Sequence, residues 1–183
     1  MAAGFDARRD MKIGGLLGLV AIGTLVALTG ACSGGGNNNA LTVGEYVQRV
    51  LSVDQEHESR AAPFRTQLDG FSSLAGDAVV PAEALTAFEG LVEEEGTFAA
   101  AIAELKPPAE AASVHQEAID ALKADRDVLE GALDQVDETT TVAELNQLFA
   151  ADDVVKADER RTNACLALQQ FVSGNGVAVD LTC

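Results

Sequence analysis

Residues 42–68 have the sequence TVGEYVQRVLSVDQEHESRAAPFRTQL, in which mostly apolar positions recur at alternating steps of four and three. An α-helix has 3.6 residues per turn, so this spacing places them on one stripe of a helix. Thr42, followed three residues later by Glu45, is a capping box and predicts that the helix begins here. Pro63 is expected to bend or interrupt the helix, because it lacks a backbone N–H. The stripe consists of Val43, Val47, Val50, Asp54, His57, Ala61, Phe64 and Leu68.

Two further segments have the same spacing. Pro81 suits the first turn of a second helix, which is expected to end near Leu105. Two more prolines, at positions 107 and 108, start a third helix that reaches about Asp137. Their stripes are Ala84, Phe88, Leu91, Glu95, Phe98, Ile102 and Leu105 in the second helix, and Ala111, His115, Ala118, Leu122, Asp125, Leu129, Ala132 and Val136 in the third.

A second capping box opens the fourth helix, with Thr141 as the cap and Glu144 three residues later. The helix is expected to be interrupted near residues 151–153 and to end by residues 174–176, whose sequence Gly-Asn-Gly is a typical stop. Stripes of this kind joined by short connections favour packing in alternating directions. The sequence therefore predicts an all-α domain over residues 41–183, an antiparallel up-down four-helix bundle with a short C-terminal tail.

The region before this domain has the order of a secretory signal. Three basic residues precede an uncharged apolar run over residues 13–28, and small residues then precede Cys32. The motif Leu28-Thr29-Gly30-Ala31-Cys32 resembles the lipobox of bacterial lipoprotein precursors. The resemblance implies that residues 1–31 are a lipoprotein signal peptide and that Cys32 is diacylated and becomes the mature N-terminus. Such a chain would be lipid-anchored and extracytoplasmic, in the cell membrane or an outer membrane.

An uncleaved transmembrane anchor is the alternative for this leader, since its apolar run approaches the length of a membrane span. Either way, the basic residues before the run place the rest of the chain outside the cytoplasm. Residues 32–40 are rich in Gly and Asn and cannot bury enough surface to order themselves, so we expect a flexible tether.

Charge limits the partners of the domain. The precursor has a net charge of −17, and because the leader contributes +1, the remaining 152 residues carry −18. Such a chain repels nucleic acid, so no nucleic-acid binding is expected, whereas cations and basic surfaces would be attracted. The alternative is that the charge only keeps a tethered envelope protein soluble.

Two cysteines remain once Cys32 is assigned to the lipid. Cys165 and Cys183 form an even pair in a compartment that permits disulfides, so we predict a bridge that pins the C-terminal tail to the last helix. Two free thiols or half of a metal site are the competing interpretations, and no further cysteine or histidine lies near them in the sequence to support a metal site.

The domain also resembles uncharacterised secreted or lipid-anchored bacterial helical proteins. The shared features are the Thr-x-x-Glu-Tyr opening at residues 42–46, the Pro-Pro-Ala-Glu helix start at residues 107–110 with His115 after it, and the cysteine-bounded tail. This resemblance implies a fold and a compartment, and it carries no known active site.

Polar residues interrupt the stripes near the middle of the bundle. Carboxylates and imidazole at that position are how carboxylate-bridged metal proteins build their sites, with Glu-x-x-His pairs from two helices. This chain has one comparable pair, Asp54-x-x-His57. The alternative is that these residues lie at the stripe edges or pair with Arg126, Arg160 or Arg161. The candidate metal ligands are Asp54, His57, Glu95, Asp125 and Asp158.

Motifs of common enzyme classes are missing from the sequence. It contains no His-Glu-x-x-His, no Gly-x-Ser-x-Gly and no phosphate-binding glycine loop. We therefore predict a binding or structural module at the cell envelope, without catalysis or a cofactor, whose partner is an unidentified envelope protein or a cation. The second hypothesis is a metal-binding or metal-buffering protein that uses the mid-bundle carboxylates and His57.

Overall fold

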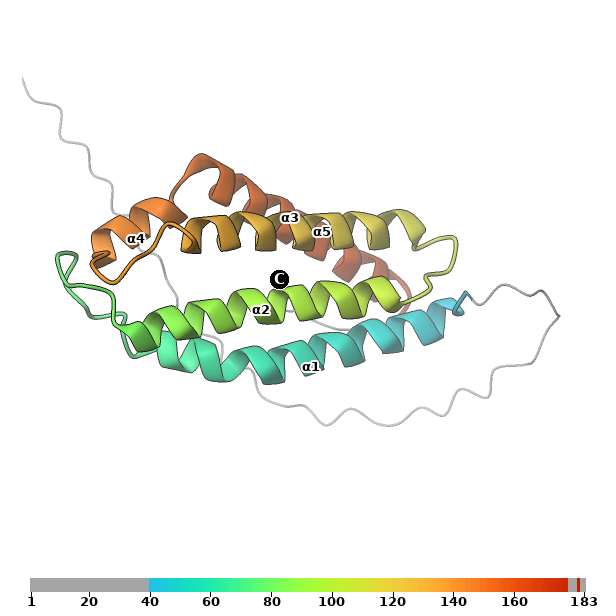
Figure 1. Ribbon diagram of the computed structural model, residues 1–183. Helices are drawn as coiled ribbons and strands as arrows, with labels where there is room; N and C mark the ends of the chain where they lie inside the picture. The colour runs from blue at the N-terminus through green and yellow to red at the C-terminus, as the bar shows by residue number, and fades with distance from the viewer. Residues whose placement is uncertain (1–39, 178–180, 182–183) are drawn as a thin grey trace, which may run out of the picture. The chain divides into compact units, whose positions relative to one another are not determined.

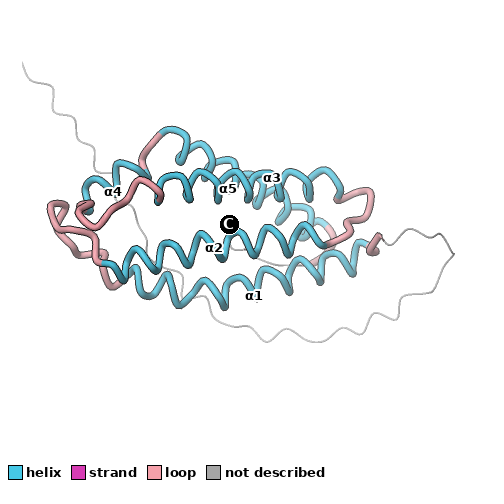
Figure 2. Tube along the Cα trace, viewed as in Figure 1, coloured by secondary structure: helices cyan, strands magenta, loops and turns pink. Residues whose placement is uncertain are grey.

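The computed structural model describes residues 40–177 and residue 181. These residues form five helices and no strand, which confirms the all-α class (Figures 1 and 2). No helix in this part of the chain is both long and apolar enough to cross a membrane. The predicted signal peptide, Cys32, most of the tether and Cys183 lie outside the described residues. The helices are α1 (Val43–Asp69), α2 (Ala82–Glu104), α3 (Ala112–Leu133), α4 (Val142–Phe149) and α5 (Asp152–Gly174).

Both predicted capping boxes are confirmed. At the start of α1 the backbone N–H of Glu45 donates to the Thr42 hydroxyl, and the Glu45 carboxylate accepts from the Thr42 backbone N–H at 2.9 Å. Thr141 and Glu144 repeat this exchange at the start of α4. Pro63 lies inside α1 and does not interrupt it. Its missing N–H removes one hydrogen bond from a helix of 27 residues, and the remaining bonds and the packing maintain the helix.

The predicted start of the third helix is wrong. The third helix begins at Ala112, because the preceding residues form a turn in which the Ala111 N–H bonds the Pro108 carbonyl. The predicted fourth helix is two separate helices, α4 and α5. The helical conformation is interrupted at Ala150 and Ala151, where Ala151 has an extended backbone with a ψ of 145°. The predicted interruption near residues 151–153 is therefore confirmed, and it divides the segment into two helices.

The long helices pack in sequence order, α1 on α2, α2 on α3 and α3 on α5. Figure 1 shows α1 and α2 side by side and running in opposite directions, with α4 at one end. At that end the loops before α2 and α4 are joined, since Val80 N–H bonds the Thr140 carbonyl and Val142 N–H bonds the Ala78 carbonyl. At the other end, Leu41 N–H bonds the Lys106 carbonyl. We call the end that carries α4 the distal end, because the chain enters the bundle at the opposite one.

Apolar side chains form three clusters along the bundle. The cluster at the Leu41 end joins α1, α3 and α5 and includes the tail residue Leu181, which is 4 % exposed. A middle cluster joins α2 and α3, and a third lies at the distal end between α2, α4 and their loops. The buried members are Tyr46, Val47, Val50, Ala111, Ala118, Leu168, Val172 and Leu181 in the first, Ala99, Ile102, Ile119 and Leu122 in the second, and Val80, Ala84 and Leu145 in the third.

Candidate functional site

A polar network joins α1 to α2. Glu94 of α2 is 7 % exposed, and its two carboxylate oxygens accept from the Arg60 Nε–H at 2.8 and 2.9 Å. The same carboxylate lies 3.2 Å from Nδ1 of His57, which is 5 % exposed. Two donors on α1 therefore satisfy one buried carboxylate on α2. A buried carboxylate without such donors would be strongly destabilising.

The His57 ring has two further neighbours on α2. It stacks on Phe98, with ring centroids 4.4 Å apart and planes inclined by 21°. Its other nitrogen, Nε2, faces Glu95 Oε1 at 3.8 Å, which is too long for a direct hydrogen bond.

A second polar network joins α3 to α5. Arg161 donates from one terminal nitrogen to Asp158 at 2.8 Å, and its Nε lies 3.1 Å from Asp125 Oδ2. Burial raises the pKa of Asp125 to about 6. The positive charge of Arg161 opposes this rise, while the negative charges of Glu95 and Asp158 add to it. We refer to both networks together as the buried charge layer.

The structure brings only part of the predicted metal set together. Asp54, His57 and Glu95 line one small cavity, while Asp125 and Asp158 pair with Arg161. The described residues contain no group of three or more His, Cys, Asp or Glu side chains that could hold a metal ion. The guanidinium of Arg161 lies between carboxylates that a cation would otherwise approach, as the alternative of arginine pairing predicts.

The small cavity is lined by residues of α1, α2, α3, α5 and the tail, and has a volume of about 50 Å³. We call it the seam cavity. Its lining combines charged and polar side chains with aliphatic ones, Leu181 of the tail among them. The lining residues are Val50, Asp54, His57, Arg65, Glu95, Phe98, Ile102, Ala118, Leu122, Arg161, Cys165, Leu168 and Leu181.

The second histidine lies near the Leu41 end and has a different environment. Nδ1 of His115 is 3.1 Å from the Tyr46 hydroxyl, and the Tyr46 ring meets both His115 and Phe171 edge to face. Burial lowers the pKa of His115 and raises that of Tyr46 to about 12. Both groups are therefore neutral near pH 7, and one hydrogen bond joins the Tyr46 hydroxyl and the imidazole Nδ1. This pair has the character of a structural contact within the core.

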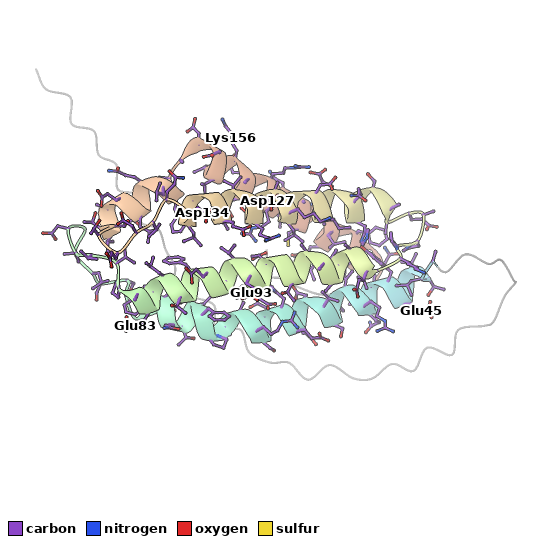
Figure 3. The ribbon with its side chains drawn as sticks, in the orientation of Figure 1. Glu45, Glu83, Glu93, Asp127, Asp134 and Lys156 are labelled. Atoms are coloured by element: carbon purple, nitrogen blue, oxygen red, sulfur yellow. The ribbon has the colours of Figure 1, made fainter. Side chains whose placement is uncertain are left out.

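An open groove of about 930 Å³ lies at the distal end, between the end of α3, the following loop, α4 and the start of α5. We call it the distal groove. Its lining includes aliphatic residues and four acidic residues, and no basic one. Asp127, labelled in Figure 3, contributes from α3. The lining residues are Asp127, Val128, Gly131, Ala132, Gln135, Asp137, Thr139, Thr140, Glu144, Gln147, Leu148, Ala151, Asp153 and Val154.

Hydrogen bonds keep two of the groove carboxylates ionised. The hydroxyl and backbone N–H of Thr139 donate to Asp137 and lower its pKa. The backbone N–H and hydroxyl of Thr141 do the same for Glu144. The groove therefore keeps its negative charge throughout the neutral and mildly acidic range.

Sequence reasoning missed the groove, and it also missed Glu94 as the buried acidic residue of α2. The capping boxes placed Glu144 at a helix start, but no sequence signal gives the angle between α4 and α5 that opens the groove. No family model matches the chain, and no curated protein or solved structure resembles it at a significant level. Function therefore has to be inferred from the residues of this chain alone.

Proposed function

We propose that this protein is a lipid-anchored, extracytoplasmic binding module of the cell envelope, without a catalytic role. In this proposal residues 1–31 are removed, Cys32 is diacylated, and residues 32–40 tether the domain to the membrane. The four long helices α1, α2, α3 and α5 are its up-down bundle, and α4 is a short insertion before the last of them. A disulfide between Cys165 and Cys183 pins the tail.

The order of the leader supports the anchoring part of the proposal. Basic residues, an apolar run, small residues and Cys32 follow one another as they do in lipoprotein precursors. Diacylation gives stable anchoring where a single acyl chain is marginal, because each buried methylene contributes about 0.8 kcal/mol.

The position of Leu181 supports the disulfide. Leu181 is 4 % exposed, packs in the cluster at the Leu41 end and lines the seam cavity together with Cys165. The tail therefore returns to the part of α5 that carries Cys165. Cys183 follows Leu181 by two residues, a span of about 7 Å at most.

The distal groove carries the binding part of the proposal. It lies at the end of the bundle opposite to Leu41. Four acidic residues and no basic one line it, which favours a basic segment of an envelope protein. The aliphatic residues in its lining suit the hydrocarbon stems of lysine and arginine side chains.

A peptide-binding experiment tests the groove. A fluorescent lysine-rich peptide is expected to bind the purified protein, and Gln147→Lys, which places a positive charge in the groove, is expected to weaken binding at least fivefold. Gln48→Lys, an exposed position on α1, makes the same change in net charge and is the control. If both variants weaken binding equally, the peptide responds to net charge alone and the groove is not its site.

A further inference from the structure

We infer that the seam cavity is a binding site for a small neutral alcohol, whose hydroxyl oxygen accepts a hydrogen bond from Arg161. The cavity is separate from the distal groove, and the inference does not depend on the proposed function. It follows from one buried donor, from the charges around that donor and from the volume and lining of the cavity.

Arg161 supplies the donor. Its Nε is buried and, among the side chains that the structure describes, is the one buried nitrogen or oxygen without a hydrogen-bond partner. Oδ2 of Asp125 lies 3.1 Å away and attracts the guanidinium as an ion pair, but the direction of the Nε–H does not make this a hydrogen bond. A buried N–H without an acceptor is destabilising, and a molecule in an adjoining space can supply the acceptor. Arg161 lines the seam cavity, so the missing acceptor is sought there.

The charges around the donor select the kind of acceptor. The Arg161 guanidinium interacts electrostatically with Asp125, Asp158 and Glu95. Three carboxylates around one guanidinium leave no excess of positive charge, so an anionic acceptor is not attracted. An ammonium ion does not fit either, because it has no lone pair with which to accept from the Nε–H. A neutral oxygen therefore suits the site best.

The volume and the lining of the cavity favour an alcohol over water. A water molecule needs roughly 10–15 Å³ of such volume and polar partners on several sides, so about 50 Å³ would hold more than one water. Most of the residues that line the cavity are apolar, and several waters would place some of them against side chains that offer no hydrogen bond. A single hydroxyl group with a short alkyl chain satisfies both parts of the lining. The aliphatic residues available to the chain are Val50, Ile102, Ala118, Leu122, Leu168 and Leu181.

The hydroxyl group also has a proton to donate. Glu95 lines the same cavity, and a carboxylate only accepts hydrogen bonds. An alcohol that accepts from Arg161 can therefore donate to Glu95, whereas a ketone of similar size can only accept. The site is expected to prefer a hydroxyl compound to a carbonyl compound for this reason.

Two neighbouring arginines give the test an internal control. The alcohol n-propanol is titrated into the ¹⁵N-arginine-labelled full-length protein, and the Nε resonances are followed. The Nε of Arg161 is expected to move saturably. The Nε of Arg160, which donates to Glu117 at 2.9 Å on the exposed side of α5, is expected to show only the linear change that the cosolvent causes. Sodium propionate is expected to give no saturable shift of Arg161, and acetone a weaker one than n-propanol.

Variants of two alanines complete the experiment. Ala118→Val enlarges a side chain that lines the cavity, while Ala167→Val makes the same change at a half-buried position of α5 outside the lining. We expect the saturable response to n-propanol to be lost in the first variant and to persist in the second. The inference is overturned by an Arg161 response as linear as that of Arg160, by an equal response to propionate or acetone, or by a response that survives Ala118→Val. If Ala118→Val does not fold, the titrations of the unmodified protein decide the question.

Discussion

Nε of Arg161 lies 3.1 Å from Oδ2 of Asp125, and this ion pair between α5 and α3 is formed although Asp125 is only 3 % exposed. The attraction to Arg161 does not fully offset the free-energy cost of burying the carboxylate, because the pKa of Asp125 remains raised to about 6. Asp125 therefore binds its proton more tightly in the folded chain than in the unfolded one.

This difference gives stability a pH dependence of known sign. Since the folded state holds more protons between pH 4 and 6, ionisation of Asp125 lowers the free energy of unfolding as the pH rises through that window. A rise of two pKa units corresponds to roughly 3 kcal/mol, of which about 2 kcal/mol falls between pH 4 and 7. The stability of the unmodified protein relative to Asp125→Asn is expected to fall by that amount. Urea unfolding of both proteins at several pH values measures this fall. A difference in stability that stays constant with pH would contradict the raised pKa of Asp125.

Phe64 of α1 packs closely against Gly90 of α2, and this contact leads to a second prediction. A Cβ at position 90 would overlap the Phe64 ring, so Gly90→Ala forces the ring to move. Overpacking of this kind costs about 1–3 kcal/mol. Gly131→Ala, where a Cβ meets nothing within 4 Å, gains helix propensity of roughly 0.5–1 kcal/mol. Thermal unfolding should therefore place Gly90→Ala below the unmodified protein and Gly131→Ala above it. The reverse order would mean that α1 and α2 are farther apart.

Arg60 is expected to contribute more to the free energy of unfolding than its exposed surface suggests. Arg60→Met leaves the Glu94 carboxylate buried with only His57 as a donor, which is expected to cost about 2 kcal/mol. Arg160→Met removes an equally short ion pair, at 2.9 Å to Glu117, but both partners are about half exposed, so the loss of stability should be clearly smaller. Denaturant unfolding compares the two. Equal losses of stability in the two variants would show that the burial of Glu94 does not determine the cost of removing Arg60.

Local signals predicted the helices well. The capping boxes at Thr42 and Thr141 act over three residues, so the sequence contains everything that forms them. The three-and-four spacing also predicted buried polar positions, since His57, His115 and Asp125 are all 5 % exposed or less. These properties depend on the helix period alone.

Properties that depend on how helices meet were less predictable. The stripe of α2 was predicted to pass through Glu95, yet Glu94 is the more buried residue. Consecutive residues lie about 100° apart on a helix, so a rotation of α2 about its axis changes which of the two glutamates is the more buried. The pairing of Glu94 with Arg60 depends on that rotation. The distal groove depends on the break at residues 150–151, where the sequence predicts an interruption but no angle.

Anchoring of the chain through Cys32 is tested by mass spectrometry of the mature protein from the membranes of a bacterial host. We expect an N-terminal peptide that begins at Cys32 and carries the mass of at least two acyl chains, and no such product from Cys32→Ser. A membrane-bound chain that retains its first residues, or a mature Cys32 without lipid, would contradict the claim.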